Sequence, residues 1–391
     1  MEIIGEFNKT WDGKAKASIW FTRIKYEFDS HSLSSSKRTT KAVLMASPSS
    51  KWTQKLKEMA LNHGFMGVGI SKAERLDDEA KQLEGWLSKG YHGDMAYMAN
   101  HFEMRVDPTK LVPGAKSVVS LMYNYYPGEC PSEISDSDNE KNKLWKERMS
   151  DTGYRMPDST QKESIQKSLS VDSFKISKYA YGEDYHKVVR RKLKELVAEL
   201  KKEVGDFHGR VFVDSAPVME RDWAKRSGQG WIGKNTLLIH PKKGSYFFLA
   251  EIILDVELDY DHPIRDHCGT CTKCIDACPT EAISPAGYIL DGSKCISYLT
   301  IELKSKIPDE FKGKMEDWIF GCDICQEVCP WNRFSKPHHE PAFEMDDRLK
   351  EYKKQDWLEL TAEVFDSIFE KSPVKRTGFE GLKRNIGFVQ N

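Results

Sequence analysis

Four cysteines crowd into residues 268–278 of the chain, in the stretch CGTCTKCIDACPT. Their spacing, C-x2-C-x2-C-x3-C-P, is the one in which three thiolates bind one iron–sulfur cluster and the last thiolate reaches a second cluster. Each cluster of this kind takes four thiolates. A chain that carries this run must therefore fold so that further cysteines arrive at the same place from elsewhere in the sequence.

Two later segments supply those cysteines. FGCDICQEVCPW, residues 320–331, carries a second Cys-Pro pair, and DGSKCISYLT, residues 291–300, carries an isolated cysteine. Two-cluster ferredoxins exchange the thiolates of their Cys-Pro pairs, which assigns the first cluster to Cys268, Cys271, Cys274 and Cys329. The second cluster then takes Cys278, Cys295, Cys322 and Cys325. A pair of structural zinc sites is the alternative, because four thiolates also suit zinc, but the repeated Cys-Pro pattern favours iron.

Composition is that of a large globular protein. The 391 residues are 39% hydrophobic and 30% charged, which suits two or three domains. Clustered cysteines in such a chain indicate metal binding more than disulfides, and the ninth cysteine, Cys130, is interpreted as a spare thiol. The formal net charge is -1, so any attraction to nucleic acid must come from local patches. Without a long apolar run or a secretory signal, we expect a cytoplasmic protein with no membrane span.

Hydrophobic periodicity predicts alternating helices and strands after a Ser-rich and charged leader or extension, residues 1–48. The expected elements are helices from Ser50 to Gly64, over 77–90 and over 184–203, and strands over 65–70 and 117–125. Residues 128–174 are strongly polar and predict a solvated insertion.

The stretch from residue 210 to residue 254 has the pattern of a strand, a turn, a helix, a glycine-rich loop and two further strands. Asp214 ends the first strand, and Pro217 suits the first turn of the helix. On local signals alone, Asp214 is most simply a carboxylate that caps this helix. The glycines of SGQGWIGKN, residues 227–235, match neither a Walker loop nor the dinucleotide fingerprint, so a nucleotide cofactor is not indicated.

The strings FVDSAPVMERDWAKRSGQGWIGKNTLLI, the cysteine segments and SPVKRTGFEGLKRN, in this order and spacing, resemble the epoxyqueuosine reductase family over residues 51–391. The resemblance implies an α+β fold, with a nitroreductase-like cobalamin-binding catalytic domain over 49–257 and a ferredoxin-like domain with two 4Fe-4S clusters over 258–340. A C-terminal helical segment over 341–391 follows. The implied reaction reduces epoxyqueuosine to queuosine at the wobble position of tRNA anticodons, with two electrons, two protons and loss of water.

The resemblance also implies roles for single residues. Asp214 matches the proton donor of the family, and we expect burial beside the corrinoid to raise its pKa and make it a general acid. Arg105 matches an arginine near the corrinoid, with an ordinary exposed cation as the alternative. Ser177 stands where some relatives carry a cysteine or another small residue. The remaining residues implied to line the cobalamin pocket are Trp231, Lys234, Asn235, Leu238, Leu249, Ile296 and Ser297. For the two leucines, plain core packing is the alternative.

No histidine stands in the pattern D-x-H-x-x-G of enzymes that bind cobalt through a histidine, and the family leaves the lower cobalt face without a protein ligand. His186 opens a helix and is interpreted as a solvated or capping histidine. The segment 296–304 directly follows a cluster ligand. We expect it to lie between cluster and cobalt, or to form a strand that covers the cluster.

The partner implied by the resemblance is tRNA, and four basic residues near the C-terminus fit contacts to phosphates: Lys375, Arg376, Lys383 and Arg384. An external low-potential electron donor is also implied, and we expect a monomer. Two other functions remain as alternatives. A reductive dehalogenase shares the cobalamin and the two clusters but usually carries a twin-arginine export signal, and a plain ferredoxin-type electron carrier leaves the long region before the cysteines without a purpose.

Overall fold

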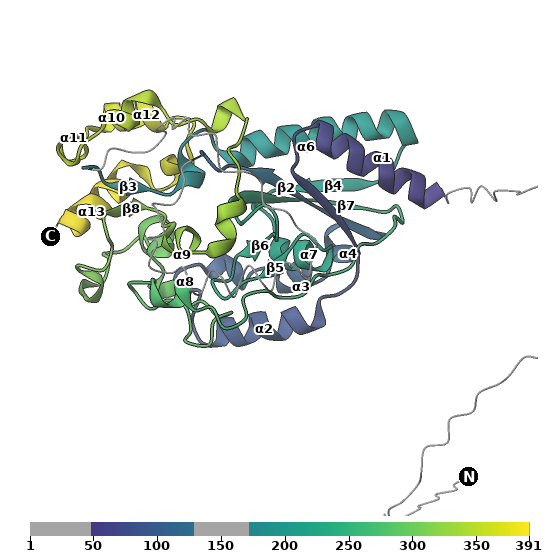
Figure 1. The fold of residues 1–391 in the computed structure, drawn as a ribbon, viewed down its shortest axis with the longest axis horizontal. Helices are drawn as coiled ribbons and strands as arrows, with labels where there is room; N and C mark the ends of the chain where they lie inside the picture. The colour runs from purple at the N-terminus through teal and green to yellow at the C-terminus, as the bar shows by residue number, and fades with distance from the viewer. Residues whose placement is uncertain (1–47, 129–171, 391) are drawn as a thin grey trace, which may run out of the picture. The chain divides into compact units, whose positions relative to one another are not determined.

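A four-stranded antiparallel sheet lies at the centre of residues 48–128 and 172–390, the part of the chain that the computed structural model describes (Figure 1). The strands run in the order β1-β2-β7-β4. Their bounds are β1 Gly67–Lys72, β2 Ser117–Asn124, β7 Phe247–Leu254 and β4 Gly209–Phe212. The two central strands, β2 and β7, are buried along almost their whole length, because helices cover both faces of the sheet.

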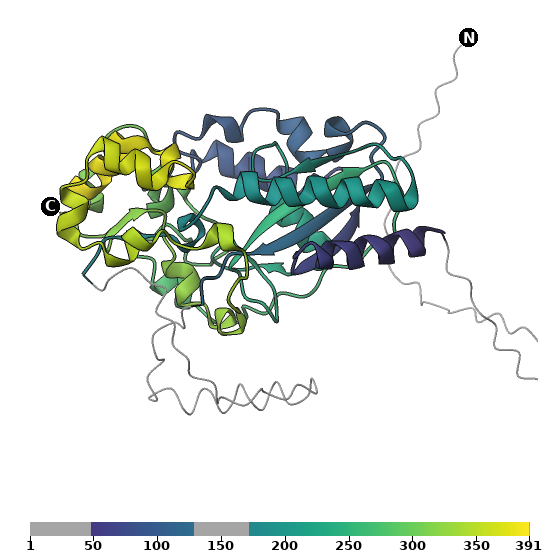
Figure 2. The ribbon, with the colours of Figure 1, turned by 90° about the horizontal axis from the view of Figure 1, so that it is seen from above.

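The long helices α1, Pro48–Asn62, and α6, Tyr185–Val204, pack together on one face of the sheet (Figures 1 and 2). Because side chains alternate along a strand, Val119 and Leu121 of β2 point into the core beneath these helices. The opposite face carries the shorter helices α2, Asp77–Ser88, α3, Phe102–Val106, α4, Pro108–Leu111, and α7, Glu220–Arg226. Residues at the intervening positions, such as Val118, point into this second core.

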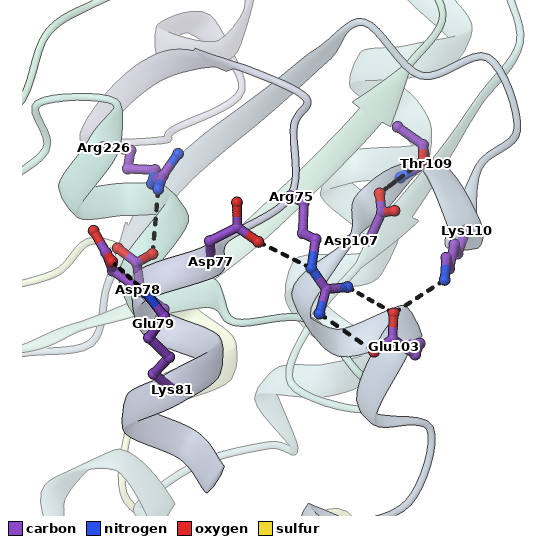
Figure 3. Close-up of polar contacts among 10 residues, drawn as sticks. All are labelled: Arg75, Asp77, Asp78, Glu79, Lys81, Glu103, Asp107, Thr109, Lys110 and Arg226. Carbon is purple, nitrogen blue, oxygen red and sulfur yellow. Dashed lines mark hydrogen bonds and ion pairs between the residues drawn. The ribbon is translucent and has the colours of Figure 1, made fainter. Parts of the chain in front are cut away.

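Ion pairs fasten the short helices of the second face to one another (Figure 3). Glu103 of α3 accepts hydrogen bonds from Arg75 at 2.6 Å and from Lys110 at 3.0 Å. Arg226, at the end of α7, donates to Glu79 of α2 at 3.2 Å. The contacts of Glu103 link α3, which carries Arg105, to α4 and to the segment before α2. The contact of Arg226 joins α7 to α2.

The cysteines lie in a loop-rich region with two matching short helices, α8, Lys273–Asp276, and α9, Ile324–Glu327, which contact each other. Two small strand pairs flank it: β5, Trp231–Ile232, with β6, Leu238–Ile239, and β3, Lys175–Ile176, with β8, Trp318–Phe320. The chain ends in α10, Asp347–Glu351, α11, Lys354–Leu358, α12, Ala362–Phe369, and α13, Gly378–Gln390. These last helices share a core with residues 174–181 and with β8.

Most elements predicted from periodicity are confirmed within a few residues. The helix from Ser50 is α1, and Gly64 follows its end with a φ of +87°, a value that glycine adopts readily. The helix carrying Pro217 was placed too early, because α7 begins at Glu220. The segment after Cys295 is not a strand, because Tyr298–Glu302 forms a helical turn.

The mixed α/β architecture agrees with the expected class. The predicted insertion lies almost wholly outside the described residues, as do Cys130 and all but residue 48 of the predicted leader. Within the described part of the chain, no helix is both long enough and apolar enough to cross a membrane.

Candidate active site

The cysteines predicted to bind the first cluster come together from two separate segments. Cys268, Cys271 and Cys274 lie around the start of α8, and Cys329 follows α9. Burial, followed by the charges of the three neighbouring thiols, raises the pKa of Cys329 to about 11. Thiols gathered in this way are readily deprotonated by a bound cation such as iron. The group therefore fits the predicted ligand set.

The second predicted group meets in the same way. Burial raises the pKa values of Cys295, Cys322 and Cys325. Charge interactions among these thiols and Cys278 raise those pKa values further, so the four groups lie close together. In the described residues, no three His, Cys, Asp or Glu side chains are placed to share one metal ion. A zinc site requires its thiolates on a single ion, whereas a 4Fe-4S cluster spreads its four thiolates over four irons. The four thiols thus fit the predicted ligand set of the second cluster.

A cavity of about 740 Å³ opens beside the second cysteine group. Ser297 and Gln326 form part of its wall, and each is a close sequence neighbour of a predicted cluster ligand, Cys295 and Cys325 respectively. The opposite side is largely apolar and comes from β6 and β7. The remaining wall is strongly charged and includes Asp214, Glu302 and Arg376, so the cavity combines the apolar surface and the placed polar groups that cofactor sites use. Its position suits a flat cofactor that accepts electrons from the adjoining cluster.

Asp214 lies in the cavity wall, just after β4, with a left-handed backbone φ of 49°. The Asp214 amide donates a hydrogen bond to the Glu220 carboxylate at 2.5 Å, which holds this strained conformation. The Tyr185 hydroxyl donates to the Asp214 carboxylate. The interpretation of Asp214 as a helix cap is wrong, because the N-cap of α7 is Met219. The carboxylate is instead free to face the cavity.

The expected rise in the pKa of Asp214 is also wrong for this structure. Burial does raise the pKa, but hydrogen bonds from His186 and Tyr185 and the positive charges of His186 and Arg376 lower it further, to below its usual range. The side chain also keeps 53% of its surface exposed. Asp214 is therefore ionised at neutral pH, and it needs a proton from a neighbour before it can act as an acid.

His186 is that neighbour, and the sequence did not reveal it. Its Nδ1 lies 2.7 Å from Asp184 Oδ1, and its Nε2 lies 3.5 Å from Asp214 Oδ2. Burial lowers the pKa of His186, but the two carboxylates outweigh this effect and raise the pKa to about 9. The residue that caps α6 is Asp184 and not His186. The interpretation of His186 as a capping residue is therefore wrong. At neutral pH the imidazole is protonated and faces Asp214.

The residues predicted to line the cobalamin pocket divide into three sets. Leu238, Leu249 and Ser297 line the cavity together with Asp214. The other set contacts the cysteine loops: the Trp231 indole donates to Cys268 Sγ at 3.4 Å, Lys234 Nζ donates to the Cys271 carbonyl at 2.9 Å, and Asn235 Nδ2 donates to the Cys325 carbonyl at 3.4 Å. The loop after α7 thus supports the cluster-binding segments.

The three other predicted pocket residues, which form the third set, do not line the cavity. Ser177 is buried and donates to Asp323 at 2.5 Å, one residue after Cys322. Ile296 is buried in the core of the helical turn that follows Cys295. Arg105 donates to the Tyr97 carbonyl at 3.0 Å, and its Nε has no partner among the described residues.

The four basic residues predicted to contact tRNA also separate. Lys375 and Arg376 line the cavity, and Arg376 pairs with Glu302 at 2.9 Å. Lys383 donates to the Leu358 carbonyl at 2.6 Å. Arg384 donates through all its nitrogens to one side-chain oxygen and to three carbonyls, those of Leu299, Leu303 and Ser305. These contacts favour a structural role for Lys383 and Arg384 and leave Lys375 and Arg376 at the cavity.

Comparisons with known proteins agree with this geometry. A family described as "4Fe-4S double cluster binding domain" matches residues 267–332, and a family described as "Epoxyqueuosine reductase QueG, DUF1730" matches residues 148–215. The chain is 54% identical to the epoxyqueuosine reductase of Leadbetterella byssophila over 87% of its length and 98% of the relative. It is 55% identical to that of Cyclobacterium marinum, over 87% of this chain and 97% of the relative.

Solved structures give the same result. A crystal structure of an epoxyqueuosine reductase with an epoxyqueuosine-modified stem loop of tRNA-Tyr matches with a TM-score of 0.70 and 30% identity, covering 86% of this chain and 80% of that one. The epoxyqueuosine reductase of Streptococcus thermophilus matches with a TM-score of 0.68 and 28% identity, over 85% and 79% of the two chains.

Proposed function

Because this chain belongs to the epoxyqueuosine reductase family, we propose that the cavity around Asp214 is where it reduces epoxyqueuosine in tRNA to queuosine. This reduction is the final step of queuosine biosynthesis, and it adds two electrons and two protons to the epoxide, whose oxygen leaves as water. One observation carries the assignment to this cavity. The wall that holds the carboxylate of Asp214 also includes Ser297 and Gln326, from the segments that bear ligands of the second cluster.

The cofactors are two 4Fe-4S clusters and cobalamin. Cobalamin bound in this cavity would supply a strongly reducing metal centre, and the clusters would supply single electrons to it. Leu238 and Leu249 line the cavity, and their apolar side chains would suit the face of a corrinoid and would exclude water from it. Ser297 lines the cavity two residues after Cys295, so this segment would join the cofactor site to the second cluster. We assign the cobalamin domain to residues 49–257, with the nitroreductase-like fold that the resemblance implies, and the ferredoxin-like domain to residues 258–340.

Asp214 delivers the proton to the departing epoxide oxygen in this proposal. His186 holds that proton before reaction, since its pKa is raised to about 9. As substrate and cofactor fill the cavity, they displace water from the exposed Asp214 carboxylate, which favours transfer of the proton from the imidazolium to Asp214. Tyr185 fixes the carboxylate in position by its hydrogen bond.

Lys375 and Arg376 sit in the same wall, where they suit the phosphates that flank the modified base of a tRNA anticodon loop. Glu302 orients the Arg376 guanidinium at 2.9 Å. Lys383 and Arg384 support this surface through the backbone of residues 299–305 and 358. Arg105, Ser177, Ile296, Trp231, Lys234 and Asn235 serve as supports for the cavity and the cluster loops. The protein acts as a monomer with an external low-potential donor.

The test is an anaerobic assay of the purified protein, reconstituted with iron, sulfide and cobalamin, on an anticodon stem loop that carries epoxyqueuosine. We expect the corrinoid spectrum to appear in the protein, and queuosine to form only with cobalamin and a reductant present. A stem loop that carries queuosine already is the matched control. Full conversion without cobalamin, or iron replaced by zinc in the active protein, would contradict the proposal.

A further inference from the structure

Two further carboxyl groups, those of Glu220 and Glu251, lie close to Asp214, where α7 packs on the sheet. Glu251 is on the central strand β7 and is completely buried, with 0% of its surface exposed. It points to the face covered by α7, whose first residue is Glu220. Among the described residues, no N–H group and no hydroxyl donates a hydrogen bond to Glu251, and the side chain that affects its pKa most strongly is the Glu220 carboxyl.

The neighbours of Glu251 on the sheet offer it no compensating charge. In the strand register Glu251 pairs with Ser120 of β2 on one side and with Phe212 of β4 on the other. The Ser120 hydroxyl is itself buried and has no partner in the described part of the chain. The titratable groups that face the pair are Asp214, His186 and Tyr185. A lone buried carboxylate is too costly to keep ionised in such surroundings, so the pair must hold at least one proton.

Glu220 is the member of the pair that reaches the cavity. This residue lines the cavity beside Asp214, and one of its carboxyl oxygens accepts the Asp214 amide. Burial and the charge of Asp214 raise the pKa of Glu220 to about 8, and burial and Glu220 raise the pKa of Glu251 well above its usual range. A proton shared between the two carboxyls is therefore stored at neutral pH with one end of the pair open to the reacting centre.

The stoichiometry of the reaction needs such a store. Both protons end on the same oxygen: the first when the epoxide carbon–oxygen bond opens to a hydroxyl, and the second when that hydroxyl leaves as water. The two electrons enter the ring carbons and become the second bond of the alkene. A single carboxyl beside the substrate can deliver one proton and then stands ionised, in a cavity closed by substrate.

We propose that Glu220 and Glu251 form a proton store that supplies the second proton of each turnover. Glu220 is the donor that faces the cavity, and Glu251 is a positioning residue that keeps the shared proton available by its own burial. The pair regains its proton from solvent after the product leaves. This inference rests on the epoxide reduction and adds a second acid to it.

The test compares the reconstituted wild-type holoenzyme with two variants, Glu251→Gln and Glu220→Gln. The matched control is Glu257→Gln, because Glu257 is exposed in the loop that follows β7. Single-turnover conversion of the epoxyqueuosine stem loop is followed from about pH 6 to about pH 9.5. We expect the wild-type rate to fall above about pH 8. Glu251→Gln removes the carboxyl that holds a proton behind Glu220, so it should run about tenfold slower at pH 8, with an unchanged KM for the stem loop.

Glu220→Gln should be slowed by about tenfold or more over the whole range, again with an unchanged KM. A profile of Glu251→Gln that coincides with the wild type would overturn the proposal, as would full activity of Glu220→Gln. A second measurement needs no substrate and covers the case in which Glu251→Gln fails to assemble. The infrared band of a protonated carboxyl should be present in the wild type near pH 7 and should change frequency in Glu220→Gln, which removes the carboxyl facing Glu251. Its absence in a wild type that still converts the stem loop refutes the store and leaves the function intact.

Discussion

His186 offers the sharpest test of the electrostatics of the site. Replacing His186 by Gln removes the cation between Asp184 and Asp214 and leaves the two carboxylates facing each other. A rise in the pKa of His186 from 6.5 to about 9 corresponds to about 3 kcal/mol of preference for the charged imidazole. Because the Asp214 side chain is 53% exposed, solvent screens the pair, and we expect about half of that figure, ~1.5 kcal/mol.

The sign of the pH dependence follows from the direction of the shift. The folded-state pKa lies above the unfolded value, so the stabilisation is complete below about pH 6.5 and disappears as the pH rises through about 9. In anaerobic thermal unfolding of the holoenzyme at matched scan rates, His186→Gln should lower Tm by about 3 °C near pH 6. Near pH 10 the difference should be close to zero.

The control is His63→Gln, which removes a histidine 2.7 Å from the exposed Glu199 carboxylate on the surface of α1 and α6. A surface pair of this kind is worth little, so its Tm should change by less than that of His186→Gln near pH 6. Equal losses for His186→Gln at both pH values would refute the reasoning, because a pH-independent loss reports packing and not the charge of the imidazole.

Four further outcomes are expected at the site. Asp214→Asn should keep its iron and bind cobalamin but lose about 100-fold or more in single-turnover rate; an unchanged rate would remove Asp214 from the chemistry. Cys278→Ser should lose about half of the bound iron, measured by colorimetric assay, whereas Cys130→Ser should lose none. Arg376→Gln should raise the KM for the stem loop about tenfold with little change in kcat, since one lost phosphate contact weakens binding; a purely kcat effect would argue against it. Trp231→Phe should lower the midpoint potential of one cluster in a spectroscopic titration, because its N–H···S bond favours the reduced cluster, and equal potentials would exclude that role.

The cluster ligands show what the sequence alone determines. Cysteine spacing within a short loop is set by local backbone geometry, so the run from Cys268 to Cys278 indicates its chemistry without any knowledge of the fold. Even the exchange of Cys329 and Cys278 between the two groups follows from that rule, and the proximity of Cys329 to Cys268, Cys271 and Cys274 agrees with it. The main helices and strands were predictable for a similar reason, because their periodicity is local.

The protonation machinery was decided only by tertiary structure. Asp214, His186 and Glu251 are far apart in sequence, and their pKa values depend on which carboxylates and cations the packing of α6, α7 and β7 brings together. The sequence predicted Asp214 at the site with a raised pKa, because burial raises the pKa of a carboxyl group. It did not show that the His186 imidazolium faces Asp214 and lowers that pKa. Charge interactions act through space and not along the chain. The sequence can therefore identify the acid residue, but only the fold determines which groups of the site are protonated.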